Sequence, residues 1–146
     1  MSRHNAPSVR TDYRHFLDLQ TRWEDNDLYG HVNNVVYYAY FDTVVNRFLI
    51  DSGGLKIHTA PVIGVVVDSQ CSYFSAIAYP DAIAAGLAVS KLGTSSVVYQ
   101  VGIFRQGEDS AVAAGHFVHV FVRRKDMQPV PIPETIRTAL ATLRVC

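Results

Sequence analysis

The sequence predicts an α+β domain in which one long buried helix is wrapped by an antiparallel sheet of about five strands. Three observations predict it: an apolar helical segment at residues 35–50, one strand pattern before it, and four strand patterns after it. The later strands are joined by short turns, which favour antiparallel pairing because parallel strands need long crossovers. With 146 residues, 49% of them hydrophobic and 18% charged, the chain can enclose one such core and does not resemble a disordered protein.

The first half of the chain contains a strand, a polar loop and the central helix. Residues 15–23 alternate apolar and polar side chains, which is typical of a strand. Residues 24–34 are dense in Asp, Asn and Gly and predict a loop. Residues 35–50 carry only a narrow polar stripe, as does a helix surrounded by protein. Asn33 is placed to cap the start of this helix, and Gly53-Gly54 to end it.

The second half reads as β-structure followed by a short helix. Strands are expected over residues 62–74, 82–92, 94–105 and 111–124. In the second of these, large side chains alternate with small ones, so we expect another part of the molecule to pack closely against its small face. Residues 133–143 predict a C-terminal helix with Pro133 in its first turn.

Composition excludes several classes of protein. Thirteen basic and thirteen acidic residues give zero net charge, so no global field attracts nucleic acid. Two cysteines cannot form a disulfide framework. The chain has no apolar run long enough to span a membrane, and its N-terminus lacks the apolar region of a secretory signal. We therefore expect a cytoplasmic protein with a flexible segment at residues 1–14 and a single domain at residues 15–146.

The densest polar cluster lies between the first strand and the helix. Here the carboxylate of Asp27, the imidazole of His31 and the amides of Asn33 and Asn34 stand beside the positive end of the helix dipole. Unpaired N–H groups at a helix start can polarise a carbonyl oxygen. A carboxylate nearby can attack the carbonyl carbon or activate a water molecule. The same composition is also typical of a solvated turn, and the residues alone leave both interpretations open.

Metal and serine-hydrolase sites are not favoured. Asp25 and Asp27 imitate the start of a calcium loop, but Val36 stands where that loop needs a bidentate Glu. His116 and His119 are three apart on a strand and so point to opposite faces. The chain contains no G-x-S-x-G motif. We expect no metal.

The polar cluster and the helix that follows it resemble a known signature. The run Arg22–Asn34, followed by Tyr37 and Tyr40-Phe41-Asp42, is similar to that of hotdog-fold acyl-CoA thioesterases of the 4-hydroxybenzoyl-CoA thioesterase family. The resemblance continues through Leu92–Ser96 and Val130–Pro133 and covers roughly residues 15–143. It implies a hotdog fold and hydrolysis of an acyl-CoA to the free acid and CoA. It also implies no cofactor beyond the CoA of the substrate, and a homodimer or homotetramer with its sites between protomers.

The resemblance also implies roles for individual residues. Asp27 would be the catalytic general base or nucleophile, and the amide near Asn34 would polarise the thioester carbonyl. His31 would orient Asp27 or water, or merely line the pocket. Asn33 is a helix cap or a substrate contact, and Asp25 a loop or supporting residue. The other expected substrate-binding residues are Tyr37, Gly93, Thr94, Ser95, Ser96, Arg123 and Arg124.

Each of these binding residues also has a plainer interpretation. Arg123 and Arg124 suit CoA phosphates, or they form a solvated strand end. Residues 93–96 match the cofactor end of the family's pocket, or form an ordinary turn. The tyrosines of the helix favour an aromatic acyl group, or pack in the core. Two other functions stay open: an acyl-CoA-binding protein without hydrolysis, and a hydratase or dehydratase in which Asp27 and His31 act around a C=C bond.

Overall fold

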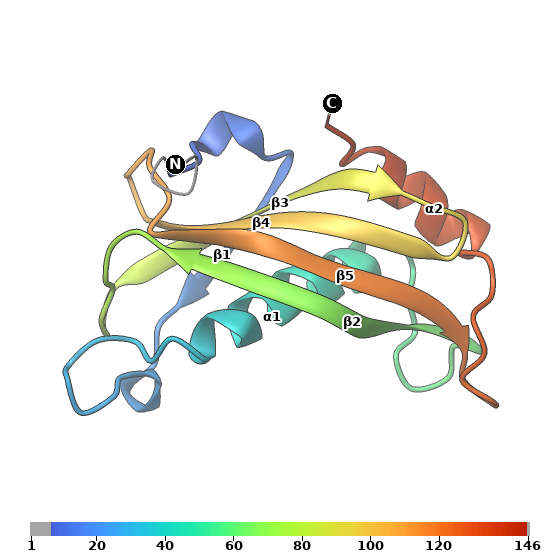
Figure 1. Cartoon of the computed structure of the whole chain (residues 1–146), viewed down its shortest axis with the longest axis horizontal. Coiled ribbons are helices and arrows are strands. Elements are labelled where there is room, and N and C mark those ends of the chain that lie inside the picture. Colours follow the sequence, from blue (N-terminus) through green and yellow to red (C-terminus); the bar gives the residue numbers. More distant parts are fainter. Residues whose placement is uncertain (1–6, 146) are drawn as a thin grey trace.

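The computed structural model describes residues 7–145 of the chain. A five-stranded antiparallel sheet in the order β1-β3-β4-β5-β2 packs one face against the long helix α1, which runs diagonally across it in Figure 1. The predicted hotdog arrangement and its number of strands are confirmed. The elements are β1 (His15–Gln20), α1 (Val36–Asp51), β2 (Val62–Tyr73), β3 (Ala82–Leu92), β4 (Ser96–Arg105), β5 (Ala113–Arg123) and α2 (Glu134–Ala141).

Helix α1 is the centre of the hydrophobic core. Seven of its side chains are buried: Tyr37, Tyr40, Phe41, Val44, Val45, Phe48 and Leu49. The cap expected at Asn33 is not formed: the helix begins after Val35, which has no side-chain cap, and the Asn33 side-chain oxygen accepts a hydrogen bond from the Val35 N–H at 3.1 Å, in the turn before the helix. The predicted end is present, because the Gly53 N–H donates to the Leu49 carbonyl at 3.0 Å and Gly54 has a φ of +69°. A left-handed residue of this kind ends many helices.

The small face of β3 is covered by the segment that precedes β1. The Tyr13 ring lies over Gly86 and Gly102, and a Cβ on Gly102 would stand 2.6 Å from that ring. The Tyr13 hydroxyl also lies 2.8 Å from the Ser8 hydroxyl. The expectation of close packing on this face is therefore confirmed. Residues 7–14 of the segment expected to be flexible thus include the ring that covers this face, where two neighbouring glycines leave room for it. Residues 1–6 lie outside the described part.

The two strand histidines do lie on opposite faces of the sheet. His119 is buried on the inner face, 3.4 Å from the Tyr99 hydroxyl and packed against Gly64. On the outer face, the His116 imidazole lies 3.1 Å from the Asp68 carboxylate. The two imidazoles therefore cannot share a metal. Among residues 7–145, no cluster of three or more His, Cys, Asp or Glu side chains could hold one.

Strand β2 is a long edge of the sheet. It pairs with β5 along one side, and its register shifts between Val66 and Asp68. Val66 and Val67 are exposed near its middle. At the end where α1 terminates, α2 covers the core with the buried side chains of Ile136 and Leu140. None of the helices within residues 7–145 is long and apolar enough to cross a membrane.

Candidate active site

The predicted polar loop is an ordered hairpin-like excursion between β1 and α1. It begins with a 3₁₀ turn, η3 (Trp23–Asp25), and Asn26 then bridges to Val32. Inside that bridge the Asp27 N–H donates to the His31 carbonyl at 2.9 Å, and the Gly30 N–H donates to the Asp27 carbonyl at 3.1 Å. Gly30 has a φ of +85°, which favours glycine in this turn. Residues 27–31 thus form the tip of a projecting hairpin.

Asp27 stands at this tip beside an open cavity. One of its carboxylate oxygens accepts a hydrogen bond from the Tyr29 N–H at 2.9 Å. Together with Trp23, Asn26, Leu28 and Gly30 it lines a cavity of about 530 Å³. Within residues 7–145, none of the salt bridges uses Asp27. Its carboxylate is therefore available to a ligand or a water molecule.

The start of α1 lines a second cavity. Asn34 contributes to about 310 Å³ of space together with Val32, Tyr37, Tyr73 and residues 74–76. The Asn34 carbonyl accepts a hydrogen bond from the Tyr73 hydroxyl at 2.9 Å. No hydrogen bond within the described residues uses the Asn34 N–H. This N–H, at the positive end of α1, suits a carbonyl oxygen.

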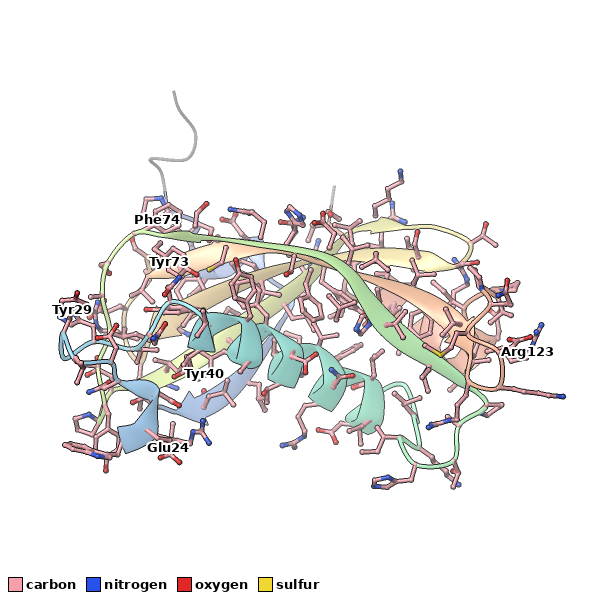
Figure 2. The ribbon with its side chains drawn as sticks, turned by 60° about the horizontal axis from the view of Figure 1, so that its bottom comes forward. Glu24, Tyr29, Tyr40, Tyr73, Phe74 and Arg123 are labelled. Atoms are coloured by element: carbon pink, nitrogen blue, oxygen red, sulfur yellow. The ribbon has the colours of Figure 1, made fainter. Side chains whose placement is uncertain are left out.

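An aromatic wall stands behind this second cavity. The Tyr37 ring makes edge-on contacts with Tyr73, at 5.0 Å between centroids, and with Tyr40, at 6.0 Å. Figure 2 shows Tyr73 and Phe74 at the end of β2, near the start of α1. Burial raises the pKa of Tyr37 to about 12, so its hydroxyl stays protonated at neutral pH. Tyr37 is a buried packing residue that also borders the cavity.

His31 and the tip of the hairpin are exposed. His31 pairs with Asp27 through its backbone carbonyl, and its side chain is open to solvent. The side chains of Trp23, Leu28 and Tyr29 are 76%, 103% and 89% exposed. These three residues cannot be recognised from the sequence, because isolated apolar residues in a polar loop show no periodicity. Their grouping around Asp27 appears only in the structure.

The remaining predicted binding residues lie at the opposite end of the sheet. Residues 93–96 follow the far end of β3, which spans eleven residues, or about 35 Å. Arg124 also lies there, and its guanidinium donates to the carbonyls of Ala60 and Ile57 at 2.8 and 2.6 Å. Arg123 pairs with Asp126 at 2.7 Å. One protomer therefore does not bring these residues together with Asp27.

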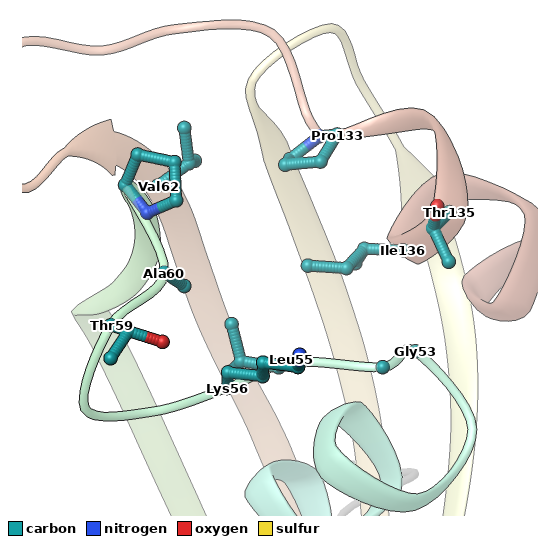
Figure 3. A pocket seen from close by; sticks show the side chains of 11 residues that line it. Gly53, Leu55, Lys56, Thr59, Ala60, Val62, Pro133, Thr135 and Ile136 are labelled. Atoms are coloured by element: carbon teal, nitrogen blue, oxygen red, sulfur yellow. The ribbon is translucent and has the colours of Figure 1, made fainter.

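A third cavity, of about 430 Å³, lies at this same far end (Figure 3). It is bounded by the loop that follows α1 and by the start of α2, and most of its lining is apolar. Lys56 supplies its one cationic side chain. The lining residues are Gly53, Gly54, Leu55, Lys56, Thr59, Ala60, Pro61, Val62, Pro133, Thr135 and Ile136.

Asp25, two residues before Asp27, has a different environment. It is 1% exposed, and its carboxylate accepts hydrogen bonds from the Tyr40 hydroxyl and from Arg22. Burial alone would raise its pKa, but the hydrogen bonds from the Arg22 N–H, the Tyr40 hydroxyl and the Arg22 guanidinium hold the pKa below its usual range. The sequence indicates a loop or supporting role for Asp25 but not its bond to Tyr40, because Tyr40 lies fifteen positions away on a helix whose pattern is that of a core element.

Comparison with known proteins agrees with the fold. The model of the thioesterase-like superfamily matches residues 21–140. The PA5185 protein of Pseudomonas aeruginosa is 54% identical, with a TM-score of 0.94 over 94% of this chain and 96% of that one. The PA2801 protein of the same organism, a proposed thioesterase, is 30% identical, with a TM-score of 0.81 over 88% and 98% of the two chains. Slr0204, a 1,4-dihydroxy-2-naphthoyl-CoA thioesterase from Synechocystis, shares the fold at 16% identity, with a TM-score of 0.77 over 86% and 94%.

Proposed function

Since the chain belongs to the thioesterase-like superfamily and is a thioester hydrolase, we propose that it hydrolyses an acyl-CoA at the Asp27 hairpin. One arrangement carries the assignment of the site. Asp27, outside the salt bridges of the described residues, lines one open cavity, the unused N–H at the start of α1 belongs to Asn34 in the second, and the bridge between Asn26 and Val32 joins the two linings. A carboxylate and a carbonyl-polarising amide are the two groups that the reaction needs.

The proposed chemistry divides between these two groups. The Asn34 N–H, reinforced by the dipole of α1, donates a hydrogen bond to the thioester oxygen and stabilises the negative charge that develops there. Asp27 takes a proton from a water molecule whose oxygen attacks the carbonyl carbon, or its carboxylate attacks that carbon itself. The C–S bond then breaks, and the sulfur leaves as CoA thiolate and takes up a proton. In the second route, water hydrolyses the resulting anhydride.

A second copy of the chain would complete this site. If the exposed edge of β2 paired antiparallel with β2 of another copy about a two-fold axis, Tyr73 would stand opposite Val62 of the partner subunit. Val62 pairs with Arg123 in the register of β2 and β5. The pairing would therefore bring the basic strand end of one chain, which one protomer keeps far from Asp27, beside the start of α1 in the other.

The surface of the described residues supports this assembly. Long unpaired edges need a partner or a cover, and Val66 and Val67 are exposed on this one. The cavity at Val62 of the partner subunit would also adjoin the cavity at Asn34. We therefore propose a homodimer at least, with both chains at each site and with Arg123 and Arg124 of the partner subunit near the CoA phosphates. Pairing of two such dimers would give the tetramer.

One screen separates hydrolysis from the alternatives. The purified protein is given acetyl-, octanoyl-, palmitoyl- and benzoyl-CoA with a thiol reagent, and crotonyl-CoA with absorbance detection of its double bond. We expect thiol release from at least one saturated or aromatic acyl-CoA. Tight binding in calorimetry without thiol release would favour an acyl-CoA-binding protein, and loss of the double bond without thiol release would favour a hydratase.

A further inference from the structure

We propose that Asp25 is a positioning residue for this reaction: with Arg22 and Tyr40 it anchors the Asp27 hairpin to the central helix. The inference rests on the proposed role of Asp27 and adds to it the device that holds Asp27 in place. It is argued from the buried carboxylate of Asp25 at the base of the hairpin, both oxygens of which accept hydrogen bonds.

Both oxygens of the Asp25 carboxylate accept hydrogen bonds. Oδ2 accepts hydrogen bonds from the Tyr40 hydroxyl at 2.8 Å and from the Arg22 backbone N–H at 2.9 Å. Oδ1 accepts from Nε and Nη2 of the Arg22 guanidinium at 3.1 and 2.9 Å. The four bonds occupy most of the lone pairs that a carboxylate offers. They join the first residues of the loop to the interior of α1.

The backbone of Asp25 reaches the other arm of the hairpin. Its carbonyl accepts a hydrogen bond from the Asn33 N–H at 2.9 Å. Asp27 lies two residues after Asp25 along one arm, and Asn34 lies one residue after Asn33 along the other. Asp25 therefore lies on the arm that leads to the proposed base, and it is hydrogen-bonded both to the arm that leads to the proposed carbonyl-polarising amide and to the helix.

Burying the Asp25 carboxylate costs free energy of folding, because the charged group loses its contact with water. The side chain of its ionic partner, Arg22, is 64% exposed, and an ion pair that solvent screens in this way adds little stability. What the Asp25 group does provide is a fixed geometry, since each of its bonds has a direction as well as a length. Small misplacements of reacting groups reduce rates by as much as about 10²-fold.

The test compares two substitutions that each remove one buried tyrosine hydroxyl. Tyr40→Phe removes the hydroxyl that binds Asp25 and keeps the ring in the core. Tyr99→Phe is the matched control, because Tyr99 is fully buried on β4 and its hydroxyl lies near His119 rather than near the hairpin. For each variant, kcat, KM and the melting temperature are measured with the best acyl-CoA of the screen, and hydrogen exchange is followed at the hairpin amides.

We expect Tyr40→Phe to lower kcat about ten-fold, to leave KM within about two-fold, and to speed exchange at the Asp27 and Gly30 N–H groups. Tyr99→Phe should keep its kcat even where its melting temperature falls as far. Equal effects of the two substitutions on kcat, or unchanged kcat and exchange in Tyr40→Phe, would overturn the positioning role while leaving Asp27 as the proposed base. Absence of thiol release from the wild-type protein on every thioester would instead overturn the proposed function, and with it the positioning role.

Discussion

The hydroxyl of Tyr73, in the last position of β2, donates a 2.9 Å hydrogen bond to the backbone carbonyl of Asn34, just before α1. This hydrogen bond connects the edge strand β2 to Asn34, whose own N–H, at the start of α1, is free to bind a carbonyl oxygen. The proposed subunit contact and the proposed oxyanion contact therefore share one tyrosine. A substitution at this edge of the sheet should therefore change kcat.

The substitution Tyr73→Phe tests this connection. It removes one hydrogen bond at a partly exposed position, which is typically worth about 1 kcal/mol, or roughly a five-fold change in rate if the bond fully forms in the transition state. We expect kcat to fall by about that factor, with little change in melting temperature. Steady-state kinetics of thiol release measure it. An unchanged kcat would show that the Asn34 carbonyl needs no such anchor.

The edge of β2 gives a prediction about assembly. Val67, 57% exposed in the middle of the strand, would stand opposite Asp68 of the partner subunit in the proposed pairing. Val67→Asp places a second carboxylate against that aspartate in each half of the contact and should yield a folded monomer with little activity. Ser110→Asp, which adds the same charge at another exposed position, should remain a dimer or tetramer. Light scattering coupled to gel filtration checks this, and an active wild-type monomer of 16.2 kDa would refute the shared site.

His31 should assist the reaction without being essential. Its side chain is exposed on the hairpin arm that pairs with Asp27 through the backbone. Because that pairing uses the His31 carbonyl, His31→Ala preserves it and removes only the imidazole. We expect a rate loss below about ten-fold, smaller than that of a general base, which is typically 10²–10⁴-fold. A loss in His31→Ala as deep as that in Asp27→Asn would make the imidazole, rather than the carboxylate, the leading catalytic group.

His119 predicts a dependence of stability on pH. The imidazole is buried against Tyr99, Phe117 and Phe121, and burial lowers its pKa from 6.5 to about 4. Between these two values the unfolded chain binds a proton that the native protein does not. The free energy of unfolding therefore falls as the pH drops through this range, by roughly 2 kcal/mol between pH 7 and pH 5.

Urea unfolding at the two pH values, with His119→Phe as the comparison, measures this contribution. The variant keeps an aromatic ring in the core and has no proton to bind, so its free energy of unfolding should change less between pH 7 and pH 5 than that of the wild type. An equal change in both proteins would assign the pH dependence to other groups.

Local patterns predicted most of the fold. The alternation of large and small side chains in residues 82–92 located β3 correctly and marked its small face, since successive side chains of a strand point to opposite faces. The loop at residues 24–34 was found in the same way, because Asn and Gly act on their near neighbours. The cap expected at Asn33 was wrong, because its side-chain oxygen binds the Val35 N–H, just before the helix begins. The strand expected over residues 15–23 proved shorter: its last residue, Trp23, begins a 3₁₀ turn instead.

Contacts between distant residues were beyond local patterns. Nothing near Arg124 indicates that its guanidinium binds the carbonyls of Ile57 and Ala60, because that contact depends on the path of a loop more than sixty residues earlier. The packing of the Tyr13 ring against Gly86 and Gly102 is likewise invisible in the sequence, because the two glycines become neighbours only when β3 and β4 pair. The separation of residues 93–96 from Asp27 within one protomer follows from strand order, which turn lengths alone do not specify.

The most direct test of the central claim is the rate of thiol release by Asp27→Asn. The substitution keeps the shape of the side chain and an oxygen that can accept the Tyr29 N–H, so the melting temperature should stay close to that of the wild type. We predict that kcat falls by at least about 10²-fold, well beyond the loss in Asp25→Asn, whose main effect should be on stability and on the placement of the hairpin. Near-normal turnover by Asp27→Asn, or equal losses in the two variants at equal stability, would contradict the assignment of Asp27 as the catalytic carboxylate.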